Sequence, residues 1–112
     1  MINETDRRML LLIVEKIERL EMVCREHTFE EIKENFVFSD TIQYEFEKIY
    51  EDTTRLSTLF KIYNPDIPID KLRGIRNRVA HDYEAVVIKI LVDTVINDLP
   101  PLKEKIKSLL SR

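Results

Sequence analysis

Apolar residues recur at three- and four-residue steps along most of the chain, the spacing that builds one face of an α-helix. The first such stretch predicts a helix over residues 5–26. Four apolar side chains form its inward face: Leu10, Ile13, Ile17 and Leu20. A capping box of Thr28 and Glu31 then predicts a short helix. Its three large apolar residues are expected to point inward: Phe29, Ile32 and Phe36.

The most regular apolar stripe comes next and predicts a single long helix that begins near Asp40, with Ser39 or Asp40 as its N-cap. The stripe runs through Ile42, Phe46, Ile49, Thr53, Leu56 and Phe60. Steps that alternate between four and three residues are typical of helices packed nearly antiparallel in a bundle. The segment "NPDIP", residues 64–68, breaks this pattern and predicts a loop.

The third long helix is predicted to begin between residues 68 and 70, with Leu72, Ile75 and Val79 on its apolar side. Residues 84–97 are rich in β-branched side chains, so a strand is the competing prediction. We favour a helix here because a lone strand would have no sheet to join. Its apolar positions cover most of the circumference, so we expect burial by the core on one side and by a second subunit on the other.

A last helix is predicted to start at Pro100 or Pro101, which suit a first helical turn. Its inward residues are Leu102, Ile106 and Leu109. The chain has one glycine and four prolines, fewer turn residues than a sheet protein of this size usually needs. Pattern and composition together predict an all-α, up-and-down bundle of four to five helices in a single domain over residues 1–112.

Composition also limits the function classes. Cys24 is the only cysteine, which excludes an intrachain disulfide and a cysteine-rich metal site and fits a reducing compartment. The N-terminal segment lacks the basic-then-apolar order of a signal peptide, and the apolar runs are too short to span a membrane. We therefore expect a cytoplasmic protein without a membrane partner. A net charge of −3 argues against a broad nucleic-acid surface and leaves room for a local basic patch.

Such a patch lies in "RGIRNRVAHDY", from Arg73 to Tyr83. The stretch from residue 71 onward concentrates four cations: Lys71, Arg73, Arg76 and Arg78. It can be a solvated helix face, in which Arg78 pairs with Asp82 and Asn77 bonds to His81, each four residues apart. It can also be a site for chemistry on RNA, because a histidine moves protons near neutral pH and an arginine binds phosphate.

Spacing restricts that chemistry. Arg76 and His81 are five residues apart, about 140° around an ideal helix, so the two cannot share one phosphate in mid-helix. They can do so if the helix ends near His81, with Asp82 capping the next one, or if a second subunit brings its own copy alongside. Imidazole can move the proton of a 2′-hydroxyl or of the leaving 5′-oxygen, and guanidinium can stabilise the phosphate charge. This chemistry requires no metal and no cofactor.

The stretch "GIRNRVAHDY" closely resembles the R-x4-H-x-Y motif of the HEPN superfamily, in its HepT-like toxin branch. The segment "VDTVINDLPPLKEKI" resembles that family's C-terminal signature, and "KIYEDTTRLS" resembles its second-helix segment, with Tyr50 where glycine is usual. The resemblance implies a helical bundle that dimerises around the motif helix, or forms a higher oligomer. It further implies a metal-independent endoribonuclease with a composite site in the dimer cleft.

The same resemblance implies a toxin of a two-gene toxin–antitoxin pair, of type II or VII-like kind. Its antitoxin would be a minimal nucleotidyltransferase of the MNT type, which transfers AMP to the motif tyrosine. Carried over residue by residue, Arg76 and His81 would be catalytic and Tyr83 would be the AMP acceptor. Four residues would support the site: Arg73, Asn77, Arg78 and, as the acid of the second helix, Glu51. Tyr50 would place a bulky ring beside that acid.

Two alternatives stay open. The domain can be a non-catalytic binding partner of a nucleotidyltransferase, which differs from the enzyme only in turnover. It can also be a structural helical adaptor, although an adaptor has no need for arginine, histidine and tyrosine at this spacing. The second histidine, His27, has no partner pattern and is expected at the surface.

Overall fold

The computed structural model describes residues 2–112, and this part of the chain contains helices and no strand. The helices are α1 (Glu4–Glu26), α2 (Phe29–Glu34), α3 (Phe36–Thr54), α4 (Thr58–Tyr63), α5 (Ile69–His81), α6 (Glu84–Asn97) and α7 (Leu99–Leu110). The predicted all-α class is confirmed. The strand alternative for residues 84–97 is wrong, because that segment is α6.

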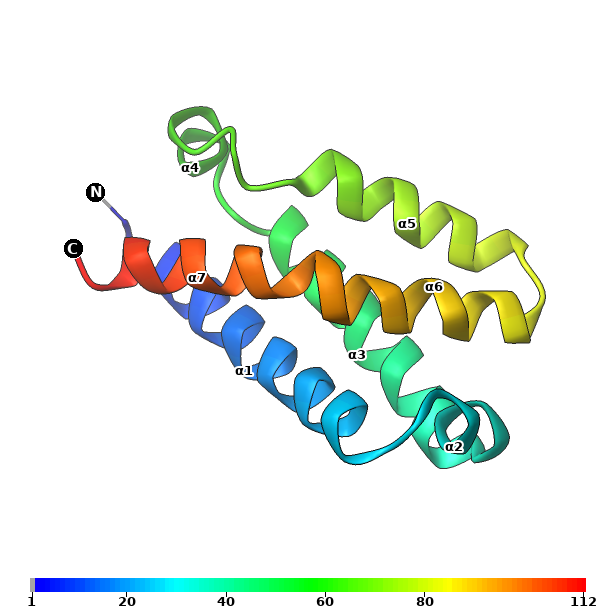
Figure 1. The fold of residues 1–112 in the computed structure, drawn as a ribbon. Coiled ribbons are helices and arrows are strands. Elements are labelled where there is room, and N and C mark those ends of the chain that lie inside the picture. The colour runs from blue at the N-terminus through cyan, green and yellow to red at the C-terminus, as the bar shows by residue number, and fades with distance from the viewer. Residues whose placement is uncertain (1) are drawn as a thin grey trace.

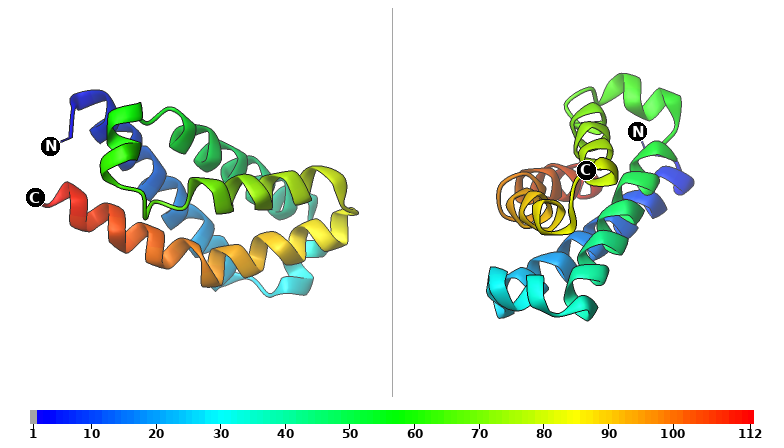
Figure 2. Two further views of the ribbon diagram at one scale, coloured as in Figure 1. Left: turned by 90° about the horizontal axis from the view of Figure 1, so that it is seen from above. Right: turned by 90° about the vertical axis from the view of Figure 1, so that its right-hand side faces the viewer.

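The long helices form an up-and-down bundle (Figure 1). α1 packs against α3, and α3 against α5. α6 contacts α1, α3 and α5, and α7 contacts α1 and α6. In Figure 1 α7 continues from α6 in nearly the same direction, and the view from above shows a bend between the two helices (Figure 2). α2 and α4 are short connecting helices. The molecule is 44 Å long. Both termini and α4 lie at one end, and the corner between α5 and α6 lies at the other.

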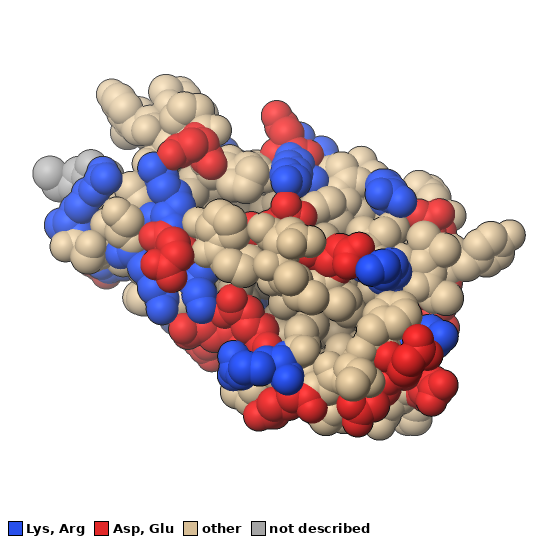
Figure 3. All heavy atoms as spheres, viewed as in Figure 1, with Lys and Arg blue, Asp and Glu red and all other residues tan. Residues whose placement is uncertain are grey.

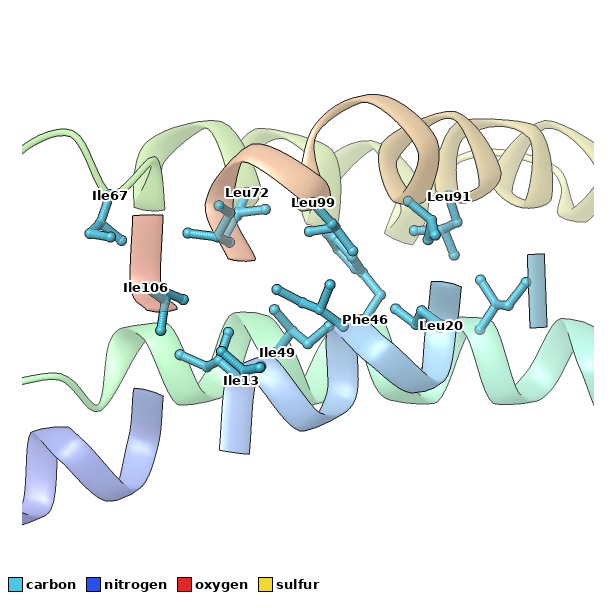
Figure 4. Packing of buried hydrophobic residues seen from close by; sticks show 14 of the residues in the cluster. Ile13, Leu20, Phe46, Ile49, Ile67, Leu72, Leu91, Leu99 and Ile106 are labelled. Atoms are coloured by element: carbon cyan, nitrogen blue, oxygen red, sulfur yellow. The ribbon is translucent and has the colours of Figure 1, made fainter. Parts of the chain in front are cut away.

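The core lies between α1, α3 and the α6–α7 rod, and α5 closes one side of it (Figure 4). The predicted inward residues of α1 are all buried, as are those of α7. Phe46 is among the largest fully buried side chains, at the centre of α3. Burying each such side chain contributes roughly 1.5–3 kcal/mol, so the apolar stripe that predicts the helices also stabilises their packing.

The start of α3 differs from the prediction. α3 begins at Phe36, and its N-cap is Asn35, whose side-chain oxygen accepts the backbone N–H of Val37 at 2.9 Å. Ser39 lies buried inside the helix instead of capping it. Phe36, expected to point inward, is 73% exposed, because the chain has just left α2 and the first turn of α3 faces solvent.

The predicted single helix through Phe60 is also interrupted. α3 ends at Thr54, and a new helix, α4, starts at Thr58. The Ser57 hydroxyl accepts the backbone N–H of Phe60 at 3.1 Å and caps this new helix. Leu56 and Phe60 are nevertheless buried as the stripe predicts, so the packing continues where the helix does not.

Asp6 on α1 fixes the interruption between α3 and α4. Its carboxylate accepts the Ser57 backbone N–H at 2.8 Å and the Ser57 hydroxyl at 2.6 Å, while Asp6 itself is only 2% exposed. A buried carboxylate needs such donors, because burial without them is costly. The contact joins residues far apart in sequence and holds the α3–α4 turn against the first turn of α1.

Replacing Asp6 by alanine should therefore lower the free energy of unfolding by about 1–3 kcal/mol, since the Ser57 backbone N–H loses its buried acceptor. Urea unfolding followed by circular dichroism measures this. The matched control is Glu4→Ala, which removes an exposed acid from the same first turn. Equal losses in the two variants would show that Asp6 acts only as a first-turn charge.

Candidate functional site

The motif stretch forms α5, a helix that is only lightly embedded in the bundle. Leu72 is its one buried residue, and Ile75 and Val79 are half-buried beside the core, which agrees with the predicted apolar side. The polar motif residues on α5 are all exposed: Arg73, Arg76, Asn77, Arg78 and His81. α5 thus presents its chemistry outward from the bundle while α3 and α6 support it from below.

The end of α5 forms a corner with α6. His81 is the last residue of α5, and Asp82 and Tyr83 are extended. The predicted role of Asp82 as cap of α6 is wrong, because the N-cap position falls on Tyr83, whose carbonyl accepts the Val87 N–H at 2.9 Å. The Asp82 carboxylate instead lies 4.0 Å from Nε of Arg78, the exposed pair expected from their spacing.

Arg76 turns toward α3. Its Nε lies 3.5 Å from a carboxylate oxygen of Glu47, and its guanidinium carbon lies 5.7 Å from the centroid of the Tyr50 ring. Glu47 and Tyr50 are three residues apart on α3, so both face the same side of that helix. Arg76 is therefore held at the α3–α5 boundary by one acid and one aromatic ring.

Arg73 shares the same ring. Its Nε donates to the Tyr50 hydroxyl at 3.2 Å, and one of its terminal nitrogens donates to the Asp70 carboxylate at 2.6 Å. The hydrogen bond with Tyr50, followed by that with Asp70, raises the pKa of Arg73 above its usual value. Arg73 therefore remains a cation at any working pH.

Glu51, the acid expected to support the site, lies elsewhere on α3. It accepts from Nζ of Lys48 at 3.2 Å, and this hydrogen bond is the main reason why the pKa of Lys48 is raised. The acid that reaches the motif is Glu47, one turn earlier, which the sequence analysis missed. The available signal was the three-residue spacing to Tyr50, which places Glu47 on the ring's side of α3.

Asn77, His81 and Tyr83 have no intramolecular side-chain partner within residues 2–112. The Asn77–His81 hydrogen bond considered from their spacing is not formed, and Tyr83 is 87% exposed. No hydrogen bond within residues 2–112 joins Arg76 to His81: Arg76 contacts Glu47 and Tyr50, and His81 is exposed at the last position of α5. Arg76 and His81 stand about 140° apart around the regular turns of α5. In one chain the polar residues of the motif are thus exposed to solvent.

Charge is mixed around the motif. On the face shown in Figure 3, acidic and basic side chains alternate over the bundle, and several basic ones gather at the end that carries the termini. A hollow lined by Asp6, Arg7 and Tyr63 also lies at that end, away from the α5–α6 corner. The motif therefore offers local cations and no continuous basic surface on this face.

The remaining candidate residues stay outside this region. Cys24 is half-buried, and burial raises the pKa of its thiol. The expected surface position of His27 is wrong in part: its ring stacks on Phe38 with centroids 4.0 Å apart, and its Nδ1 is buried.

Residues 2–112 bring no three His, Cys, Asp or Glu side chains together in a metal-binding group. No helix in this range has the length and apolar character needed to cross a bilayer.

Comparison with known proteins places the chain in a family. The family model described as "Ribonuclease HepT-like" matches residues 13–109. A protein of Thermococcus cleftensis named "Probable ribonuclease HepT" is 31% identical over 97 residues, which cover 87% of this chain and 88% of that protein. A putative RNase of Caldanaerobacter subterraneus subsp. tengcongensis is 24% identical over 109 residues, 97% of each chain. No solved structure matches the chain. The protein therefore belongs to the HepT-like ribonuclease family.

Proposed function

We propose that this chain is a metal-independent endoribonuclease toxin whose active site forms where two copies bring their motifs together. Its class as a ribonuclease follows from the family. The observation that supports a site built from two copies is the different placement of Arg76 and His81 around α5. Arg76 turns toward α3, and His81 stands about 140° away at the exposed end of α5. When Arg76 of one copy binds the phosphate, His81 of a second copy then transfers the proton.

The chemistry needs only a proton carrier and an anion clamp. The 2′-hydroxyl attacks the adjacent phosphorus while its proton passes to a base, and the bond to the 5′-oxygen breaks as that oxygen takes up a proton. The imidazole of His81 performs one of these transfers, and the guanidinium of Arg76 stabilises the charge on the phosphoryl oxygens. The products are a 2′,3′-cyclic phosphate and a free 5′-hydroxyl.

Exposed apolar side chains support the pairing of two copies. α6 buries Val87, Leu91 and Val95 in the core, yet Val86 and Ile96 on the same helix remain exposed. An interface between two copies typically covers about 800 Å² on each copy. Burial of apolar side chains is the main source of stability for such an interface. Val86 lies in the first turn of α6 at the motif corner and Ile96 lies at the other end of the helix, so an interface along α6 would favour a two-fold dimer that also brings two motifs together.

Control of the toxin would act at Tyr83. Its hydroxyl is accessible without any unfolding, since Tyr83 is 87% exposed and lies two residues from His81 across the extended Asp82. In AMP transfer the phenolic oxygen attacks the α-phosphorus of ATP, the phenol proton goes to a base, and pyrophosphate leaves. The added phosphate would pair with motif cations and occupy the position that the RNA phosphate needs. The donor enzyme would be the MNT-type nucleotidyltransferase antitoxin.

The catalytic proposal predicts that His81→Ala lowers the RNA cleavage rate by about two to four orders of magnitude, as expected for a general acid–base residue. The rate is measured on a labelled RNA, with the product ends identified by mass spectrometry. The matched control is His27→Ala, because His27 packs on Phe38 away from the motif. EDTA should leave the wild-type rate unchanged.

Equal activity of the His81 variant and the wild type would contradict the catalytic role, and loss of wild-type activity in EDTA would contradict the metal-independent mechanism. Absence of cleavage by the wild type on any RNA tested would favour the alternative, a non-catalytic partner of the nucleotidyltransferase. Thermal unfolding of each variant confirms that the fold is retained.

The control proposal predicts that Tyr83→Phe abolishes AMP transfer while the ring and the fold are kept. Intact-mass spectrometry after incubation with the nucleotidyltransferase and ATP measures the adduct. Tyr63→Phe is the matched control, because Tyr63 is 75% exposed at the opposite end of the bundle. An adduct of equal yield on the Tyr83 variant and the wild type would refute the assignment.

A further inference from the structure

Tyr50 is the one side chain of α3 that contacts two motif arginines. Its hydroxyl accepts from Nε of Arg73 at 3.2 Å, and its ring lies under the guanidinium of Arg76 at 5.7 Å. The ring itself is half-buried and packs beside the core. Tyr50 is thus fixed from below by packing and from one side by Arg73, with a face of its ring turned to Arg76.

The two contacts of Arg76 use different parts of its guanidinium. An aromatic ring can attract the flat face of a guanidinium. The N–H groups of the guanidinium, in contrast, donate hydrogen bonds within its plane. No hydrogen bond joins Arg76 to Tyr50 within residues 2–112, so the ring contact leaves the N–H groups of the guanidinium available for a phosphate. A carboxylate oxygen of Glu47 lies 3.5 Å from Nε, and because both side chains are partly exposed, 44% and 41%, solvent weakens this ion pair enough for a phosphate to displace it.

We propose that Tyr50 is a positioning residue, whose ring holds the Arg76 guanidinium at the α3–α5 boundary with its hydrogen-bonding edge open to a phosphodiester. The hydrogen bond from Arg73 fixes the orientation of the ring, and the Asp70 carboxylate holds Arg73 in turn. The inference deepens the proposed function and rests on it, in that Arg76 is taken to bind the scissile phosphate.

A purely structural role for Tyr50 makes a different prediction. If the ring only fills space beside the core, any apolar side chain of similar bulk can replace it. The position of the Arg76 guanidinium is then unchanged by the substitution. Tyr50→Leu keeps apolar bulk and removes the aromatic face, while Tyr50→Phe keeps the face and removes only the hydroxyl. Tyr44→Leu is the matched control: it lies on the same helix, is exposed, and stacks under Lys48, outside the motif.

The first measurement is independent of activity. In nuclear magnetic resonance spectra of the isolated protein, the Nε–H signal of Arg76 should carry a ring-current shift from Tyr50. This shift should disappear in Tyr50→Leu, persist in Tyr50→Phe, and persist in the Tyr44→Leu control. An Arg76 signal that is unchanged in Tyr50→Leu would overturn the contact and the inference with it.

The second measurement is kinetic. Tyr50→Leu should lower kcat/KM for RNA cleavage by about two- to five-fold, the effect of one exposed cation–ring contact, and Tyr50→Phe should restore most of it. In an Arg76→Ala background, Tyr50→Leu should cause no further loss, because the two residues act as a unit. An equal loss in both backgrounds would overturn the positioning role.

The two measurements separate the inference from the proposed function. If the wild type cleaves no RNA, the proposed function fails, and the Arg76 signal alone decides whether Tyr50 holds that guanidinium. If the wild type cleaves RNA and Arg76→Ala does not impair it, the role of Arg76 in phosphate binding fails. The positioning role of Tyr50 in catalysis then fails with it.

Discussion

The regular twist of α5 is the constraint that sets where Arg76 and His81 lie around the helix, and the proposed active site depends on it. About 100° of rotation per residue places Arg76 against α3 and His81 on another side, at the exposed end of the helix. One of the two arrangements that would let both residues serve one phosphate is present, because α5 ends at His81 and Asp82 is extended. In one chain Arg76 contacts Glu47 and Tyr50 and makes no hydrogen bond with His81, and the proposed function therefore draws on a second copy of the chain.

The bundle explains why α5 can present such residues at all. Its stability comes from the core between α1, α3 and the α6–α7 rod, together with buried polar links such as Asp6–Ser57 and the 2.6 Å ion pair between Lys16 and Asp52. α5 contributes one fully buried side chain and the half-buried Ile75 and Val79, and its polar motif residues remain exposed. A lightly embedded helix on a rigid support can vary its exposed chemistry without loss of the fold.

Helix periodicity was enough to predict the inward faces of α1 and α7, because these depend on local spacing and burial. For α6 the absence of other predicted strands decided between helix and strand. The interruption at Ser57 was not visible, since it depends on Asp6, fifty-one positions away in sequence. The start of α3 was misplaced because Asn35, Ser39 and Asp40 are all competent caps, and only packing selects Asn35. In the site, a helix end near His81 was one of two alternatives left open by the sequence, and the structure has it. The contact of Tyr50 and Glu47 with Arg76 arises from the α3–α5 packing.

The central claim, that a functional site combines residues of two copies, is tested most directly by complementation. Arg76→Ala and His81→Ala, each expected to have strongly reduced activity, are unfolded together, refolded as an equal mixture and assayed for RNA cleavage. A site shared between two chains predicts that the mixture regains about one quarter of the wild-type rate, because half of the randomly paired dimers hold one intact site of two. A mixture no more active than either variant alone would contradict the account.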